Sequence, residues 1–223
     1  MTRKPGVLVV GASGHARVVL DAIERAGRYR VLGFIADGRK RGEREGGYRV
    51  LGGEAEFAAI ASRLGARSGV IAIGDNWQRD QVRRRLLRQA PRFSFVTIVH
   101  PAAVVARGAA LGAGTVVMAG AVINPGAAVG ECCIVNTGAS LDHDCRMGNF
   151  SSLAPGAVVG GNVRIGRYTA IGLGASVIHR RKIGEHAVVG AGAVVLEDLP
   201  ARCVAYGVPA RNARPRKPGD PYL

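Results

Sequence analysis

Aromatic side chains, acidic residues and long apolar runs are all scarce in this chain of 223 residues. Aromatic residues make up 5% of the sequence. No stretch approaches the roughly 20 consecutive apolar residues that a membrane-spanning helix needs. The first residues also lack the apolar segment of a secretion signal. We therefore expect a cytoplasmic protein with no membrane partner, and the hydrophobic content of 48% predicts a folded one.

Cysteine is also rare, and its spacing excludes the usual zinc motifs. The chain has four cysteines, with no C-x-x-C pair and no histidine cluster beside them. Two of them replace small residues in the repeat described below. We interpret them as reduced thiols that fill space, and we predict no metal site. The four are Cys132, Cys133, Cys145 and Cys203.

The shortage of acidic residues leaves a net charge of +15. This balance favours anionic partners, either nucleic acid or small molecules that carry phosphate. No aromatic platform or nucleic-acid motif lies among the basic residues, so we interpret them as a solvated basic surface and predict no nucleic-acid partner. Five arginines fall on one expected helix, namely Arg79, Arg83, Arg84, Arg85 and Arg88.

A period of six is the chain's most abundant pattern. An aliphatic residue occupies every sixth position from Val105 to Val195, and a second, mostly small residue follows four positions later, with Arg181 as the exception. This period fits neither an α-helix nor an amphipathic strand, and it predicts a hexapeptide β-helix with three units to a coil. Glycine often follows the aliphatic residue, as at Gly112, and we interpret these glycines as backbone freedom at tight bends.

The first hundred residues instead predict an α/β domain. Apolar strands are expected at 7–10, 31–35, 70–73 and 93–99, with helices up to Gly27, at 54–64 and at 77–89. Such alternation predicts a small parallel sheet that binds ligands at the carboxyl ends of its strands. We expect a Rossmann-like domain over residues 1–99 and an all-β domain over residues 100–223.

Three segments should converge at that edge of the sheet. The turn G-A-S-G-H ends at His15, Asp37 follows the second strand, and Gly74 follows the third. The turn places backbone N–H groups at a helix N-terminus, which favours phosphate. On the residues alone, His15 fits a ligand contact or a side chain packed on the loop equally well.

Together, these motifs resemble the family of sialic acid O-acetyltransferases and nucleotide-sugar N-acetyltransferases. The segment Asn136–Cys145 has the pattern N-T-G-A-x-x-D-H-D-C, and Gly207–Arg211 is similar to the G-x-P-A-K/R ending of hexapeptide acyltransferases. The resemblance implies a left-handed β-helix, a homotrimer, acetyl-CoA as co-substrate, and transfer of an acetyl group to the 4-amino group of a nucleotide-linked sugar.

His143 is the candidate general base of that reaction. An imidazole has an ordinary pKa near ~6.5, so it can take a proton from an attacking amine and return it to the leaving group. Asp142 or Asp144 could orient the ring, and the family pattern favours Asp144. Direct transfer needs no acyl-enzyme, and Cys145 should point inward because it lies in the small-residue register.

The resemblance also implies the binding residues. The nucleotide-sugar would contact Ser13, Gly14, His15, Asp37 and Gly74. Acetyl-CoA would lie near Ser152, Gly161, Leu173, Gly190, Ala191 and Gly192. Some relatives have a second histidine where this chain has Ser152, so that contact is expected to be weaker or replaced.

Two other functions remain open from the sequence. One is an O-acetyltransferase that acts on sialic acid or a related sugar. The other is a binding or scaffold protein without catalysis that uses its basic surface. The phosphate-binding turn favours a nucleotide-linked substrate, and the cluster around His143 favours an enzyme.

Overall fold

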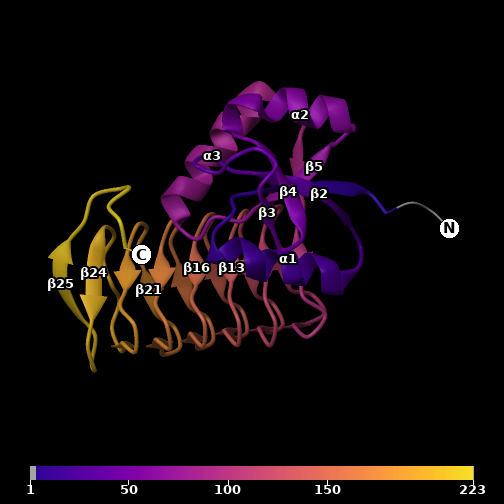
Figure 1. The fold of residues 1–223 in the computed structure, drawn as a ribbon. Helices are drawn as coiled ribbons and strands as arrows, with labels where there is room; N and C mark the ends of the chain where they lie inside the picture. The colour runs from indigo at the N-terminus through magenta and orange to yellow at the C-terminus, as the bar shows by residue number, and fades with distance from the viewer. Residues whose placement is uncertain (1–3, 223) are drawn as a thin grey trace.

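The computed structural model describes residues 4–222, so the outer ends of the two expected domains, at Met1 and Leu223, lie outside the described residues. An α/β domain stands on one side of a β-helix whose coils stack in a row (Figure 1). Within the described part of the chain, no helix combines the length and apolar character that crossing a bilayer requires.

The N-terminal domain is built on a six-stranded sheet in the order β3-β4-β2-β1-β5-β6. Strands β1, β2 and β5 are parallel and carry the buried aliphatic runs that the sequence predicts. The strands are β1 (Gly6–Val10), β2 (Arg30–Ile35), β3 (Arg44–Glu45), β4 (Tyr48–Gly52), β5 (Ser68–Ile71) and β6 (Ser94–Phe95). The helices are α1 (Gly14–Ala26), α2 (Phe57–Leu64) and α3 (Asn76–Gln89), and a short 3₁₀ helix covers Glu54–Glu56.

Two parts of this domain differ from the sequence prediction. The segment between β2 and the 3₁₀ helix, for which the sequence predicted no strand, contains the hairpin of β3 and β4, which turns through Gly46 and Gly47, both with positive φ. The expected strand 93–99 is two strands in two sheets, because β6 pairs with β5 whereas β7 pairs with β10 of the β-helix.

The β-helix has three parallel sheets, named here by their first strands. The β7 sheet contains β7 (Ile98–Val99), β10 (Val116–Val117), β13 (Ile134–Val135), β16 (Ser152–Leu153), β19 (Ala170–Ile171), β22 (Val188–Val189), β24 (Cys203–Tyr206) and the antiparallel β25 (Arg211–Pro215). The β8 sheet contains β8 (Val104–Val105), β11 (Val122–Ile123), β14 (Ser140–Leu141), β17 (Val158–Val159), β20 (Ser176–Val177) and β23 (Val194–Val195). The β9 sheet contains β9 (Ala110–Leu111), β12 (Ala128–Val129), β15 (Arg146–Met147), β18 (Arg164–Ile165) and β21 (Lys182–Ile183).

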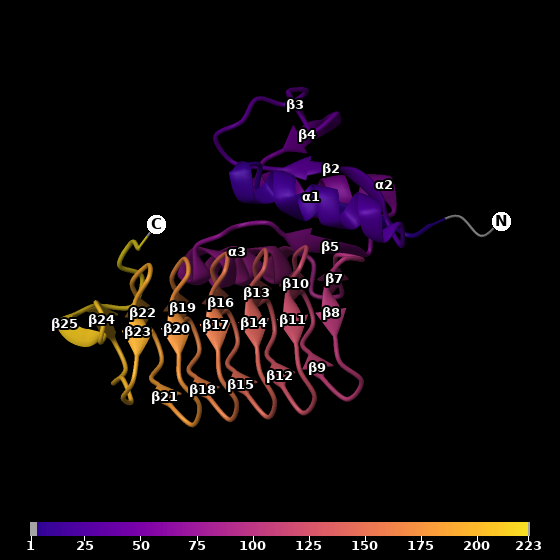
Figure 2. The same cartoon turned by 90° about the horizontal axis from the view of Figure 1, so that it is seen from below.

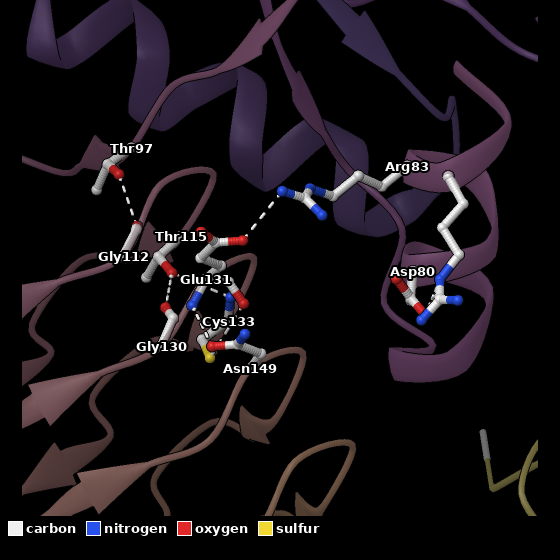
Figure 3. Close-up of polar contacts among 10 residues, drawn as sticks. Asp80, Arg83, Thr97, Gly112, Thr115, Gly130, Glu131, Cys133 and Asn149 are labelled. Carbon is white, nitrogen blue, oxygen red and sulfur yellow. Dashed lines mark hydrogen bonds and ion pairs between the residues drawn. The ribbon is translucent and has the colours of Figure 1, made fainter. Parts of the chain in front are cut away.

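The predicted left-handed β-helix is therefore confirmed, with three hexapeptides to each coil. Each strand pairs with the strand one coil away, as Val117 does with Val135, and the aliphatic register fills the interior. The second, small register also points inward, and Ala139 and Cys145 are fully buried. Threonines in this region bond to the next coil, such as Thr115, whose hydroxyl donates to the Gly130 carbonyl at 2.7 Å (Figure 3).

The interpretation of the glycines after the aliphatic positions was wrong. Gly112 and its equivalents do not have the positive φ that would require glycine. A Cβ on Gly112 would instead overlap the backbone of Gly130 in the next coil. These glycines allow the coils to stack closely. The positive φ falls two residues later, at corner positions such as Gly114 and Asp144.

The N-terminal domain covers the β7 sheet. Helix α1 and the outward side chains of Ile98, Val116 and Ile134 share one apolar core, and α1 and α3 lie along this side of the coils (Figure 2). The ion pair between Arg83 and Glu131, at 3.0 Å, also joins α3 to the β-helix (Figure 3).

Arg79 shows that the basic residues do not all form a solvated surface. Its side chain is 1% exposed, and its guanidinium donates to the carbonyls of Ile73 and Gly74 in one domain and of Cys132 and Phe150 in the other. A buried charge requires such partners, because without them desolvation would destabilise the fold by several kcal/mol. Arg79 therefore joins the two domains.

Candidate active site

The residues 142–144 form the turn after β14, at the corner between the β8 and β9 sheets. The ring nitrogen Nδ1 of His143 lies 2.9 Å from Oδ2 of Asp144, and both side chains are about half exposed, at 54% and 58%. Asp144 has a φ of 58°. Aspartate adopts this left-handed conformation more readily than most residues. The corner geometry thus turns the carboxylate toward the ring.

Asp142 contacts the backbone of the turn and a neighbouring amide, not the imidazole. Its Oδ1 accepts the backbone N–H of His143 at 2.7 Å and the side-chain amide of Asn124 at 2.8 Å. These bonds lower the pKa of Asp142 and shape the turn. Of the two aspartates that the sequence left open, Asp144 is the one that contacts the imidazole.

The hydrogen bond to Asp144 raises the pKa of His143 above its ordinary value. In the tautomer that donates Nδ1–H to this carboxylate, Nε2 carries the free lone pair and can accept a proton. Cys145 points inward as expected, with its thiol donating to the Gly160 carbonyl at 3.1 Å. Burial raises the pKa of that thiol, which disfavours the reactive thiolate form.

Gly161 lies one coil above His143. Its neighbour Asn162 donates its backbone N–H to the His143 carbonyl at 2.9 Å, which fixes the two coils together. A Cβ on Gly161 would overlap the imidazole at Nε2. The absence of a side chain at Gly161 therefore leaves the room in which the ring sits.

A cavity of 520 Å³ lies at the carboxyl ends of β1, β2 and β5, where the sequence predicts a ligand. Ser13 and Asp37 line it, together with Arg39 and Arg85. Asp37 also accepts the backbone N–H of Glu54 at 2.8 Å. Arg39 and Arg85 were not predicted as site residues, because nothing in their local pattern separates them from the other arginines.

Helix α1 begins at this cavity, and its N-terminus is suited to binding an anion. Its N-cap residue Ser13 makes no side-chain capping bond, and the first turn contains no acidic residue. The backbone N–H groups and the positive end of the helix dipole are therefore available to phosphate. A Cβ on Gly14 would meet no atom within 4 Å, so the space beside it is open.

A second cavity, of 380 Å³, lies between the two domains. His15 and Gly74 line it from one side and Ser152 from the other. Burial lowers the pKa of His15 to about 4, so its imidazole is neutral near pH 7. The Nε2 atom of His15 is buried without a hydrogen-bond partner among the described residues. Further lining residues are Asn136, Leu173, Gly190, Ala191 and Tyr222.

The structure divides the expected acetyl-CoA residues into two groups. Ser152 lies on the β7 sheet and Leu173, Gly190 and Ala191 lie beside it, whereas Gly161 lies with His143 at the far edge of the β8 sheet. Gly192 lines neither cavity and occupies a corner with positive φ. One chain therefore does not bring His143 to the cavity that Ser152, Leu173, Gly190 and Ala191 line.

Residues 4–222 contain no group of three or more His, Cys, Asp or Glu side chains that could hold a metal ion. The four cysteines are buried free thiols in the described structure.

Comparison with known proteins identifies the family. The model of the PglD N-terminal domain matches residues 6–86. The crystal structure of PerB from Caulobacter crescentus, in complex with CoA and GDP-perosamine, superposes with a TM-score of 0.88 and 36% identity over 94% of this chain and 97% of PerB. The chain belongs to the PglD-like family of nucleotide-sugar N-acetyltransferases. The resemblance seen in the sequence is thereby confirmed.

Other members of the family agree in fold. The acetyltransferase domain of PglB from Neisseria gonorrhoeae, solved with acetyl coenzyme A, matches with a TM-score of 0.85 and 32% identity over 94% of this chain and all of that domain. A curated relative, UDP-N-acetylbacillosamine N-acetyltransferase of Bacillus subtilis, is 36% identical over 111 residues. That alignment spans 49% of this chain and 50% of the Bacillus protein.

Proposed function

We propose that His143 is the general base for transfer of an acetyl group from acetyl-CoA to the 4-amino group of a nucleotide-linked sugar. As a member of its family, the chain is an acetyl-CoA-dependent sugar N-acetyltransferase. The Bacillus and Caulobacter relatives are N-acetyltransferases, which favours an amine over the hydroxyl of sialic acid as acceptor. The observation that carries the proposal is the His143 imidazole, held by Asp144 at Nδ1 and free at Nε2.

The proposed reaction needs no covalent enzyme intermediate. The sugar amine attacks the thioester carbonyl, and Nε2 of His143 takes the proton that the nitrogen loses. As the tetrahedral intermediate collapses, the carbon–sulfur bond breaks and the imidazolium returns the proton to the thiolate of CoA. Asp144 stabilises the imidazolium and holds the tautomer, while binding of both substrates supplies the alignment. Structures of the Caulobacter enzyme with one histidine replaced by alanine or asparagine support a histidine in this role.

We assign the two cavities to the two substrates by their chemistry. The 520 Å³ cavity combines the N-terminus of α1 with Arg39 and Arg85, which suits the nucleoside diphosphate. The 380 Å³ cavity is lined mainly by apolar side chains, which suits the pantetheine arm of acetyl-CoA. His15 and Gly74, which also line the 380 Å³ cavity, favour a position for the sugar between the two cavities.

The separation of His143 from this cavity supports a homotrimer. The outward residues of the three sheets favour the β8 sheet as the interface between copies. The β7 sheet is covered by the N-terminal domain, and the β9 sheet carries the charged residues Arg146, Arg164 and Lys182. The outward residues of the β8 sheet are Val104, Val122, Ser140, Val158, Ser176 and Val194. Cyclic association through this uncharged face would bring His143 of one copy to the cavity of the next.

The identity of the sugar can be tested by thiol release. Wild-type protein with acetyl-CoA is offered GDP-perosamine and a UDP-linked 4-amino-sugar, with sialic acid as the hydroxyl acceptor. We expect thiol release with one or both amino-sugars and none with sialic acid. Thiol release with sialic acid alone contradicts the proposed function. The absence of thiol release with every acceptor offered contradicts it as well.

Replacing Gly14 should separate the two substrates. A Gly14→Val side chain projects into the open space at the start of α1 and should weaken nucleotide-sugar binding at least about tenfold by blocking approach of the diphosphate. The affinity for CoA should change less than twofold. Calorimetry with each ligand measures both affinities, with Ser62→Val as a control at an exposed position of α2. Unchanged nucleotide-sugar affinity would show that the turn is only structural.

The Asp144→Asn variant should shift the pH dependence of the reaction. The carboxylate raises the pKa of His143, so its loss lowers that pKa. Because the base acts when neutral, wild-type kcat/KM rises with pH through the raised pKa, and the variant's acidic limb should move to lower pH. Its plateau should fall about tenfold, since the ring is less well oriented. An acidic limb at the same pH in both proteins would contradict the pairing.

A further inference from the structure

The end of the chain forms a strap from Arg216 to Tyr222 that runs back from β25 to the start of α3. Arg216 is 7% exposed, its backbone N–H donates to the Arg202 carbonyl at 2.9 Å, and its guanidinium donates to the His186 carbonyl at 3.1 Å. The backbone N–H of Lys217 donates to the Asp220 carboxylate at 2.7 Å. Buried charge with these partners fixes the strap against the β-helix.

Tyr222 brings an aromatic ring from this strap into the 380 Å³ cavity. Its hydroxyl oxygen accepts the backbone N–H of Asn76 at 2.9 Å, and the guanidinium carbon of Arg216 lies 5.4 Å from the ring centroid. Burial raises the pKa of Tyr222, so the phenol keeps its proton. A hydroxyl that accepts one bond in this way still has a hydrogen to donate.

Ser152 is the neighbour of Tyr222 across the cavity wall. Asn76 contacts both, since its backbone N–H bonds to Tyr222 and its side-chain amide donates to the Ser152 hydroxyl at 3.1 Å. Ser152 carries a short side chain and lines the same cavity as Tyr222. The strap therefore places the large side chain of Tyr222, with its polar hydroxyl, beside the small side chain of Ser152 on the β-helix.

We propose that Tyr222 is part of the acetyl-CoA site, where its ring forms one wall and its hydroxyl donates to an oxygen of the acylated pantetheine arm. This assignment rests on the proposed function, which gives the 380 Å³ cavity to that arm. The cavity remains open with Tyr222 in place, so this residue lines the cavity and does not fill it. Leu173, Gly190 and Ala191 complete the same lining.

Calorimetric titration of the full-length assembled protein with CoA and with acetyl-CoA tests the proposal without need of an acceptor sugar. Tyr222→Phe removes the hydroxyl and keeps the ring, and it should weaken acetyl-CoA binding about three- to tenfold. Tyr222→Ala removes the wall as well and should weaken both ligands more than tenfold. Tyr29→Phe, in the N-terminal domain and outside the cavity, is the matched control and should bind as wild type does.

Binding of GDP and UDP provides the second readout, because a nucleotide in the 520 Å³ cavity does not reach Tyr222. We expect whichever nucleotide binds wild type to bind the Tyr222 variants within twofold. Wild-type CoA affinity in Tyr222→Phe and Tyr222→Ala overturns the proposal. Tighter CoA binding also overturns it, since the strap would then block the site, and loss of nucleotide affinity alone would assign Tyr222 to the acceptor. Failure of wild type to release thiol with any amino-sugar, while CoA still binds, counts against the proposed function and leaves this test intact.

Discussion

Replacing His143 with alanine is expected to lower kcat by about 10²- to 10⁴-fold, the usual contribution of a general base. The KM for acetyl-CoA should change much less, because the imidazole acts on a proton that moves only during the reaction. The ring is half exposed at a corner of the β-helix, so the variant should keep its fold and melt close to wild type. Steady-state thiol release at saturating substrate measures the effect.

Asn124→Ala is the control for the His143 experiment. It removes the side-chain amide that donates to Asp142 from the neighbouring coil, and it leaves the pair of His143 and Asp144 in place. This variant should retain activity within about tenfold of wild type. A His143→Ala enzyme within threefold of wild type would show that another group takes the proton.

A charge on the outward face of the β8 sheet should abolish both assembly and activity. Val158 is 49% exposed in the single chain and lies at the middle of this uncharged face. Val158→Glu would place three carboxylates near the axis of a trimer, and burying such unpaired charges costs several kcal/mol each. We expect a folded monomer by sedimentation equilibrium, with activity below about 1% of wild type.

Two variants distinguish assembly from a general effect of substitution. Val158→Thr keeps the size of the side chain and should stay trimeric and active, and Arg88→Glu changes the charge of an exposed residue on α3, away from this face. A Val158→Glu monomer with full activity would show that one chain holds a complete site. A Val158→Glu trimer would place the interface on another face.

The repeat was predictable because every coil obeys the same steric rule. An aliphatic residue must fill the interior at each sixth position, so a sequence count finds all sixteen strands from β8 to β23 without any tertiary information. A contact between His143 and a neighbouring aspartate was predictable for a related reason, since adjacent residues at a corner are close in any fold. Both features depend on local spacing, whereas the choice of Asp144 over Asp142 depends on the geometry of the corner.

Features that depend on distant partners were missed. The strand β3 has only two residues, both charged, and its pairing with β4 depends on a turn of two glycines, so the sequence predicted no strand there. Arg79 looks like its exposed neighbours in sequence, and only its carbonyl partners in the β-helix explain its burial. Tyr222 lies 146 residues from Asn76, and no periodic pattern links them.

The pairing of strands one coil apart limits how the length of this chain can change. Adding or removing six residues within the β-helix would rotate everything downstream by one third of a turn about the long axis. The strap would then leave from another side of the prism, and Tyr222 would no longer face Asn76. Only an insertion of a whole coil keeps the angle, but it moves the strap about 4.8 Å farther from α3. Natural variation in length should therefore collect in the loops of the N-terminal domain, while the number of hexapeptides between Asn136 and Arg216 stays fixed.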